Sequence, residues 1–298
     1  MKLTIPTLLI FLIAINTHGQ ISTTKVAQAQ NEVTDNTPYD SLENFLGKNV
    51  YRYVGQELFI RGKAESLRKY GYDGFQNNYT TEKYNTTNYE KLNGKYFKVL
   101  EVIKHPQNAT KYYLKLETKE SKDIIYYKYD SRFSALPFVV VGFFIKQKQL
   151  LTGQEFILRG RNWISENPMT DIKTGKVVSN FESGAKWKCV DLTIEEKYYT
   201  LSLILQNEKG EQIPLNIENI KDTYWVFKTS IAAKFDSEAW KLILDGKVKI
   251  GMTKEMCELS FGKPKSINET ITSGKKTEQW VYSKNYLYFD NGILTAIQ

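Results

Sequence analysis

The residues that could carry catalysis are few. The 298-residue chain contains two histidines, His18 and His105, and two cysteines, Cys189 and Cys257. His105 stands beside Pro106 in an expected solvent-exposed loop, and a single histidine cannot supply a histidine-based metal site. Neither a G-x-S-x-G nucleophile motif nor a glycine-rich phosphate loop between a strand and a helix is present. The sequence therefore predicts a protein that is not an enzyme and that holds no cofactor or metal.

Carboxylates leave one route to hydrolysis open. Pairs such as Glu238 and Asp245 exist, but the chain has 33 acidic residues and any single pair carries little weight. A glycosidase needs two carboxylates that face each other across a cleft. Two alternatives to a plain binding protein follow: an envelope hydrolase with a carboxylate site, and a glycan-binding protein.

Residue types suited to recognition gather between residues 68 and 94. This segment is rich in Tyr, Asn, Thr and Gly, which together supply rigid aromatic area and adaptable hydrogen bonds. A disordered polar insertion is the alternative interpretation. The predicted binding residues lie here and near the C-terminus: Tyr70, Tyr72, Tyr79, Tyr84, Tyr286 and Tyr288.

The N-terminus indicates export. Residues 1–19 combine Lys2, the short apolar run Leu8–Ile15 and small residues before a cleavage site, which is typical of a signal peptide. A polar, aperiodic leader is expected over 20–38. No cysteine follows the apolar run, so a lipid anchor is not expected. We predict an exported protein, periplasmic or secreted.

Partners are predicted from charge and hydropathy. Removing residues 1–19, which carry one lysine and no acid, lowers the formal net charge from +8 to +7. The lysines are scattered, which favours an envelope protein or an anionic envelope polymer over nucleic acid. Residues 136–145 form the longest later apolar run, which is too short to span a bilayer. We expect a buried strand there, no transmembrane helix in the mature chain, and at most peripheral contact with a membrane.

Four sequence runs occur twice in the same order. GQELFIRGK from Gly55 matches GQEFILRGR from Gly153, and three strand-like runs follow each copy. These begin at Lys95, Lys111 and Asp123 in the first copy, and at Lys186, Lys197 and Gln212 in the second. Short strands separated by turn residues predict two tandem antiparallel units of the β-barrel or sandwich type.

The predicted domain plan follows from this repeat. The first unit is expected over 39–135 and the second over 136–235, each with a bend at Gly62 or Gly160 after its first strand. A helical turn is expected over 40–47. Cys189 falls in a strand and Cys257 in a helix, which favours two separate buried thiols over a disulfide, although an exported chain permits one.

Residues 236–298 form a different pattern. Asp236 or Ser237 can cap one helix that ends at Gly246, and Thr253 can cap a second that ends at Gly262 and Pro264. Three strands are expected after them, with a turn at 283–285 and a second at Asn291–Gly292. The chain is thus predicted to be mainly β, with a small α+β module of two helices and a three-stranded antiparallel sheet at its end.

This last pattern resembles the SmpA/OmlA (BamE-like) family. The matching residues are Gly251, Met252, Thr253, Gly262, Pro264, Trp280, Tyr282, Tyr288, Phe289, Asn291 and Gly292. The resemblance implies a non-catalytic binding module of Gram-negative cell envelopes, whose best-known members are lipoproteins that help to assemble outer-membrane proteins. It adds association with the outer membrane as a further option for this chain. A β-lactamase-inhibitor-type fold is similar too. Trp280 and Phe289 are expected in the core, and Tyr286 or Tyr288 on an exposed platform.

Overall fold

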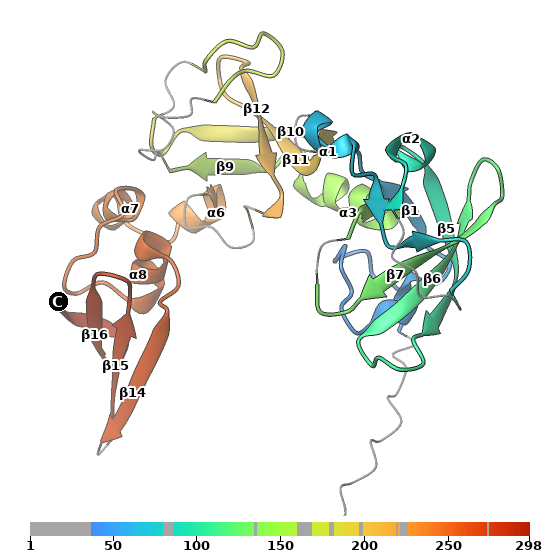
Figure 1. Ribbon diagram of the computed structural model, residues 1–298. Coiled ribbons are helices and arrows are strands. Elements are labelled where there is room, and N and C mark those ends of the chain that lie inside the picture. The colour runs from blue at the N-terminus through green and yellow to red at the C-terminus, as the bar shows by residue number, and fades with distance from the viewer. Residues whose placement is uncertain are drawn as a thin grey trace, which may run out of the picture. The chain divides into compact units, whose positions relative to one another are not determined.

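The computed structural model describes residues 37–79, 86–133, 136–159, 169–178, 182–196, 199–218, 220, 226–272 and 274–298. The expected signal peptide and almost all of the leader lie outside these residues, as do Tyr84 and Gly160. The described chain is mainly β, and its strands form antiparallel sheets (Figure 1). Among the described helices, none has the length and apolar character needed to cross a bilayer.

The first large sheet has six strands in the order β3-β7-β6-β5-β1-β8. In β1, Leu58 and Ile60 are buried, whereas Phe59 points to the opposite, partly exposed face, because successive side chains of a strand alternate between faces. The bounds are β1 Glu57–Ile60, β3 Phe75–Gln76, β5 Tyr96–Lys104, β6 Lys111–Thr118, β7 Ile124–Asp130 and β8 Phe138–Val140.

The second large sheet repeats the strand order of the first. Its order β12-β11-β10-β9-β13 matches β7-β6-β5-β1-β8 strand for strand. The Gly55 amide donates to the Val99 carbonyl at 2.8 Å, and the Gly153 amide donates to the Cys189 carbonyl at 2.8 Å. The sequence repeat therefore extends to topology. The bounds are β9 Glu155–Leu158, β10 Lys186–Glu195, β11 Thr200–Gln206, β12 Gln212–Asn216 and β13 Val226–Lys228.

Cross-strand register corrects the alignment of the two copies. Leu58 pairs with Phe97 and Phe156 pairs with Trp187, so Trp187 corresponds to Phe97 and not to Tyr96. By the same comparison, Lys111 of β6 corresponds to Thr200 of β11 and not to Lys197. Runs of similar strand residues can be matched in several registers, and only the pairing with a neighbouring strand selects one.

Of the two predicted types, barrel and sandwich, the barrel is wrong, because none of the sheets in the described chain closes. Closure requires the two edge strands to pair with each other, and here β3 and β8 stand at opposite ends of the first sheet, as do β12 and β13 of the second. The apolar run 136–145 contains the predicted buried strand only over Phe138–Val140. It forms the short strand β8 and then enters the helix α3, Val141–Leu151, because an apolar run by itself fits a buried strand or a buried helix.

The described part of the tyrosine-rich segment is folded. It contains β2 (Tyr72–Asp73) paired with β4 (Thr86–Thr87), and a helical turn, α2 (Tyr89–Leu92), capped by Asn88. Short helical turns also occur as α1 (Glu65–Arg68), α6 (Thr229–Ala232) and the 3-10 turn η1 (Val50–Tyr53). The helical turn expected over 40–47 is absent, and those residues form bends and a turn before η1.

The C-terminal part begins with two capped helices, as predicted. Asp236 accepts the Ala239 amide at 2.8 Å at the start of α7 (Ser237–Leu244), and Thr253 accepts the Met256 amide at 3.3 Å at the start of α8 (Lys254–Phe261). Gly262 ends α8 with a φ of 82°, a conformation that favours glycine.

The sheet beside these helices has four strands where three were expected. β14 (Ser266–Thr272), β15 (Lys275–Val281), β16 (Tyr286–Asp290) and β17 (Ile293–Ile297) form a meander in chain order. The first strand escaped prediction because it is exposed on both faces and so lacks an apolar alternation. Asn291 and Gly292 both have positive φ, 48° and 84°, which confirms the predicted two-residue turn.

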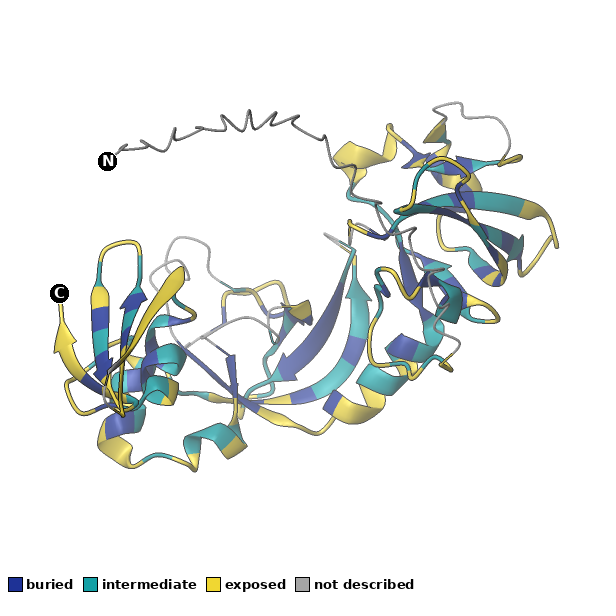
Figure 2. Ribbon diagram, turned by 90° about the horizontal axis from the view of Figure 1, so that it is seen from below, coloured by how far each residue is buried: buried dark blue, intermediate teal, exposed yellow. Residues whose placement is uncertain are grey.

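The described residues form two apolar cores, and Figure 2 shows the buried residues of the chain in dark blue. The larger contains residues of both large sheets, and the smaller contains Trp280 and Phe289, which confirms their expected burial. The smaller core also includes Ile157 and Phe227, from β9 and β13 of the second sheet. The C-terminal elements therefore share a core with the second sheet, and the predicted domain boundaries remain predictions.

Candidate functional site

The strongest candidate site is a cavity of about 450 Å³ that we call the aromatic pocket. Phe59 on β1 and Tyr96 on β5 are cross-strand partners, and their ring centres lie 4.9 Å apart. Both rings are only partly buried. Val139 on β8 is the partner of Phe59 on its other side. One row of cross-strand neighbours on the outer face of the first sheet therefore forms an apolar floor.

Three segments wall this floor. Val141 and Phe144 come from α3, and Ile194 and Tyr199 come from the end of β10 and the turn that follows it. Polar groups complete the lining at Asn93, Thr193 and Glu196. A cavity with an apolar, aromatic interior and a few polar groups is the usual form of a binding site for a small ligand or a single side chain.

Tyr199 is held over the backbone of Gly62. A Cβ atom on residue 62 would overlap the ring of Tyr199, so a side chain there would displace it. The Arg68 guanidinium donates to the Tyr199 hydroxyl at 3.1 Å and lies 5.3 Å from the ring centre of Tyr89. Gly62 was expected to mark a bend, but its φ is not in the left-handed region. The close approach of the Tyr199 ring to the backbone explains why this position holds a glycine.

Two lysines flank the pocket aromatics. Lys119 Nζ lies 5.2 Å from the ring centre of Tyr96 and pairs with Glu57 at 2.8 Å. The hydrogen bond to Glu57 raises the pKa of Lys119. Lys148 Nζ lies 5.9 Å from the ring centre of Phe144 and pairs with Asp191 at 2.7 Å. The surroundings of the pocket therefore combine ring faces with two lysine–carboxylate ion pairs.

The second sheet has an equivalent outer surface, but helices of the chain cover it. Register places Ile157 where the first sheet has Phe59, and Phe227 where it has Val139. Ile157 is 4% exposed and Phe227 is 2% exposed, and both pack in one apolar cluster with Ile243 of α7 and Cys257 of α8. The aromatic pocket is thus the partly open counterpart of a surface that, one repeat later, packs against helices of the chain itself.

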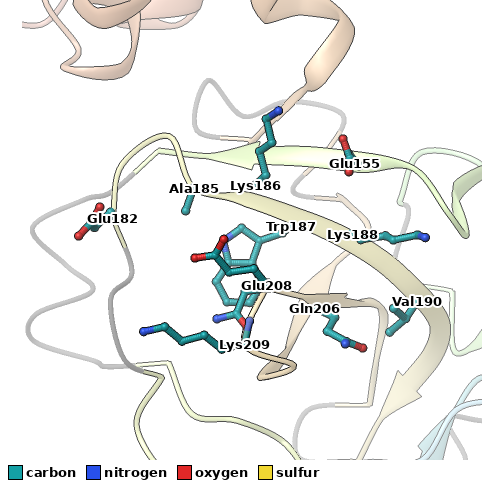
Figure 3. A pocket seen from close by; sticks show the side chains of 11 residues that line it. Glu155, Glu182, Ala185, Lys186, Trp187, Lys188, Val190, Gln206, Glu208 and Lys209 are labelled. Atoms are coloured by element: carbon teal, nitrogen blue, oxygen red, sulfur yellow. The ribbon is translucent and has the colours of Figure 1, made fainter.

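A second, larger cavity of about 830 Å³ lies on the second sheet (Figure 3). Trp187 is among its lining residues but is only 1% exposed, so it offers little ring surface. The rim carries charges of both signs: Glu155, Glu182, Glu208, Lys186, Lys188 and Lys209. Mixed charge of this kind is typical of a solvated surface, and we rank this cavity below the aromatic pocket.

The predicted binding tyrosines do not form one site. Tyr70 is 59% exposed beside Lys69. Tyr79 is partly exposed and packs on Tyr113 and Tyr126 at ring-centre distances of 5.8 and 5.1 Å. Tyr72 is buried, stacks on Tyr89 and donates to the Arg61 carbonyl, so its predicted availability to a ligand was wrong. Tyr84 lies outside the described residues.

On the C-terminal sheet, Tyr286 and Tyr288 share the face of β16 that points away from the core. Tyr286 is 40% exposed. Tyr288 is half-buried, accepts from the Gln279 side chain at 3.0 Å and donates to the Gln298 side chain at 2.8 Å. These two residues keep the predicted position on an open surface, at a distance along the chain from the aromatic pocket.

The residues of the C-terminal motif hold that module together. The Gly251 amide donates to the Leu294 carbonyl, and the Leu294 amide donates to the Met252 carbonyl, each at 2.8 Å, so this segment covers the start of β17. Tyr282 donates to the Gly262 carbonyl at 2.8 Å, next to Pro264. These motif residues have structural roles, as was expected for the whole motif, including Thr253, Trp280, Asn291 and Gly292.

The residues with catalytic potential lie in the interior. His105, expected in an exposed loop, is instead buried and stacked on Tyr113, because the turn after β5 folds it onto the sheet. Cys189 and Cys257 are both free and buried, as favoured from their positions. Within the described ranges, no His, Cys, Asp and Glu side chains group in a way that could hold a metal ion.

The pocket residues Phe59, Tyr96, Phe144 and Tyr199 were missed from the sequence. The one signal for Phe59 was a large aromatic at the exposed phase of an alternating strand. Comparison with family models, with curated proteins and with solved structures finds no match for this chain. Its function therefore has to be argued from its own geometry.

Proposed function

We propose that this chain is an exported binding or scaffold protein of the cell envelope, without catalytic activity, that binds a partner polypeptide through the aromatic pocket. The observation that carries the proposal is the correspondence of Phe59 with Ile157. In the second sheet this surface packs against helices of the same chain. The equivalent surface of the first sheet has the same strand positions and leaves about 450 Å³ open, which suits an apolar side chain of another polypeptide.

The charged residues beside the pocket also bear on the kind of partner that would fit it. Lys119 and Lys148 stand beside the pocket rings, and the formal net charge of the chain is positive. A segment that presents an aromatic or aliphatic anchor would fill the apolar floor, and acidic neighbours in it would compete with Glu57 and Asp191 for the two lysines. An anionic envelope polymer is the competing ligand, and it would use the lysines without filling the apolar floor.

The C-terminal module is proposed to be BamE-like, as its motif suggested. The capped helices, the Gly262 stop, the buried Trp280 and the Asn291–Gly292 turn support that assignment. The additional strand β14 departs from the expected three-stranded sheet. We propose that this module contributes to the scaffold and that its outer tyrosines form a secondary contact surface.

Site-specific photocrosslinking tests the proposal. A photoreactive phenylalanine analogue replaces Phe59, and a matched control carries it at Phe133, which is 62% exposed outside the pocket. With envelope extract, we expect a discrete protease-sensitive adduct at position 59 and none at position 133. A third variant carries the analogue at Tyr286, and an adduct only in that variant would move binding to the C-terminal sheet. A protease-resistant, glycosidase-sensitive adduct would indicate a polymer ligand.

A separate assay addresses catalysis. The purified chain is incubated with isolated peptidoglycan and with envelope polysaccharide, and soluble fragments are measured. Release of fragments that grows with time and with protein concentration would refute the non-catalytic part of the proposal. Binding without release is the expected outcome.

A further inference from the structure

The two outer strands of the C-terminal sheet are β17 and β14. Residues 251–254 cover only the start of β17, where the Lys254 amide also donates to the Gly292 carbonyl at 3.2 Å, and Thr295–Ile297 are exposed. β14, at the other end, has β15 as its one strand neighbour among the described residues. All six residues from Ser266 to Ile271 are exposed (Figure 2). A long open edge presents unpaired backbone groups that can pair with another strand.

The sequence of β14 is close to a chemical palindrome. Reading outward from Glu269, Asn268 mirrors Thr270, Ile267 mirrors Ile271, and Ser266 mirrors Thr272. Ile267 is 50% exposed and Ile271 is 70% exposed. Residues two apart along a strand lie on one face, so both isoleucines share a face with Glu269. If an antiparallel partner strand had the same sequence and were centred on Glu269, each residue would therefore lie opposite one of similar chemistry.

We propose that two copies of the chain associate through β14, by antiparallel pairing about a two-fold axis at Glu269. Ile267 of one copy then lies opposite Ile271 of the other, and this apolar pair occurs twice. Such a two-fold interface is self-complementary by construction. The result is one continuous sheet of eight strands, four from each copy.

The charges at the centre permit this pairing. Two Glu269 side chains would face each other, but Lys276 Nζ lies 2.8 Å from Glu269 and 3.2 Å from Glu278. Lys254 pairs with Glu278 at 2.9 Å. Each Glu269 therefore brings its own ammonium partner, Lys276, to the axis, which offsets the direct opposition of like charges that destabilises strand pairs.

Sedimentation of the purified chain tests the association. We expect a reversible dimer, and we expect Ile267→Lys or Ile271→Lys to weaken it about a hundredfold, because each change acts at both symmetric contacts. The matched control is Ile250→Lys, since Ile250 is 61% exposed but lies outside β14. A particle of single-chain mass at every concentration, or a dimer that both β14 substitutions leave intact, would overturn the proposal.

Disulfide trapping tests the register. Directly opposed strand residues are close enough for a disulfide, so Glu269→Cys should form a covalent dimer on mild oxidation. Thr270→Cys would face Asn268 of the other copy and should not. The natural cysteines are buried and should not compete. Equal trapping of both variants, or of neither, would overturn the proposed axis.

Discussion

Arg61 and Arg159 occupy the same position, immediately after β1 and β9, and each binds backbone carbonyls of the structure that follows it. Arg61 donates to the Leu136 carbonyl at 2.5 Å. Burial lowers the pKa of Arg61, while the charge of nearby Glu218 acts to raise it. Arg159 is 4% exposed and donates to Ser260 at 2.8 Å, to Leu259 at 2.6 Å and to Ile243. One position of the repeat thus anchors successive parts of the chain.

Replacing Arg159 should loosen the C-terminal helices. Its three acceptors are carbonyls in the last turns of α7 and α8, where orphan carbonyls and the helix dipole favour a cation. We expect Arg159→Met to lower the free energy of unfolding by about 3 kcal/mol, because buried carbonyls lose their donors. Urea titration followed by tryptophan fluorescence measures this.

The controls for Arg159 come from two other arginines. Arg61→Met should have a smaller effect, since Arg61 binds one carbonyl where Arg159 binds three. Arg132→Met should leave stability nearly unchanged, because Arg132 forms an exposed ion pair with Asp130. An effect of Arg159→Met no larger than that of Arg132→Met would contradict the role assigned to the buried guanidinium.

Gly62→Ala should push Tyr199 away from the first sheet. The added Cβ overlaps the Tyr199 ring, and overpacking of this kind typically costs about 1–3 kcal/mol. Thermal or urea unfolding of Gly62→Ala, of Tyr199→Ala and of the double variant forms a mutant cycle. If the clash is the cause, the alanine at 62 becomes nearly harmless once Tyr199 is removed. A cost that persists in the double variant would point to the backbone instead.

Stability should fall in acid through Glu278. Burial of this carboxyl opposes its ionisation, but hydrogen bonds from Lys254, Trp280 and Lys276 outweigh burial and lower its pKa to about 2 from the ordinary 4.5. The stabilisation is therefore complete above pH 4.5 and is lost as pH falls towards 2. A shift of this size corresponds to roughly 3 kcal/mol.

Urea unfolding at a series of pH values between 5 and about 2 measures the contribution of Glu278. Glu278→Gln should be less stable at pH 5 and should show a flatter pH dependence in this window. Glu238→Gln is the matched control, because Glu238 makes an exposed ion pair with Lys249. Identical slopes for the parent chain and Glu278→Gln would exclude Glu278 as the source.

The two thiols should resist alkylation in the folded chain. Burial raises the pKa of Cys189 to about 11 and that of Cys257 to about 12, so neither forms much thiolate near neutral pH. We expect slow labelling by iodoacetamide in buffer and rapid labelling of both in urea. Ile250→Cys supplies an exposed thiol as the positive control. Rapid labelling of a natural cysteine under native conditions would show that its burial is transient.

Signals confined to a few neighbouring residues were readable from the sequence. The caps at Asp236 and Thr253, the stop at Gly262 and the turn at Asn291–Gly292 depend on local backbone chemistry and were predicted at the right residues. The repeat was also readable, because four similar runs of residues occur in the same order in both copies. The run 136–145 was not resolved, since an apolar run fits a strand and a helix equally well.

Tertiary structure alone decided the candidate site. Phe59 and Tyr96 are 37 positions apart and meet because β1 pairs with β5 in one register. Tyr199 reaches them only through the packing of a turn of the second sheet over Gly62. The sequence by itself determined that the chain builds repeated antiparallel sheets and a capped helical end. Which faces those sheets leave open depends on long-range register and packing, which local residue chemistry does not encode.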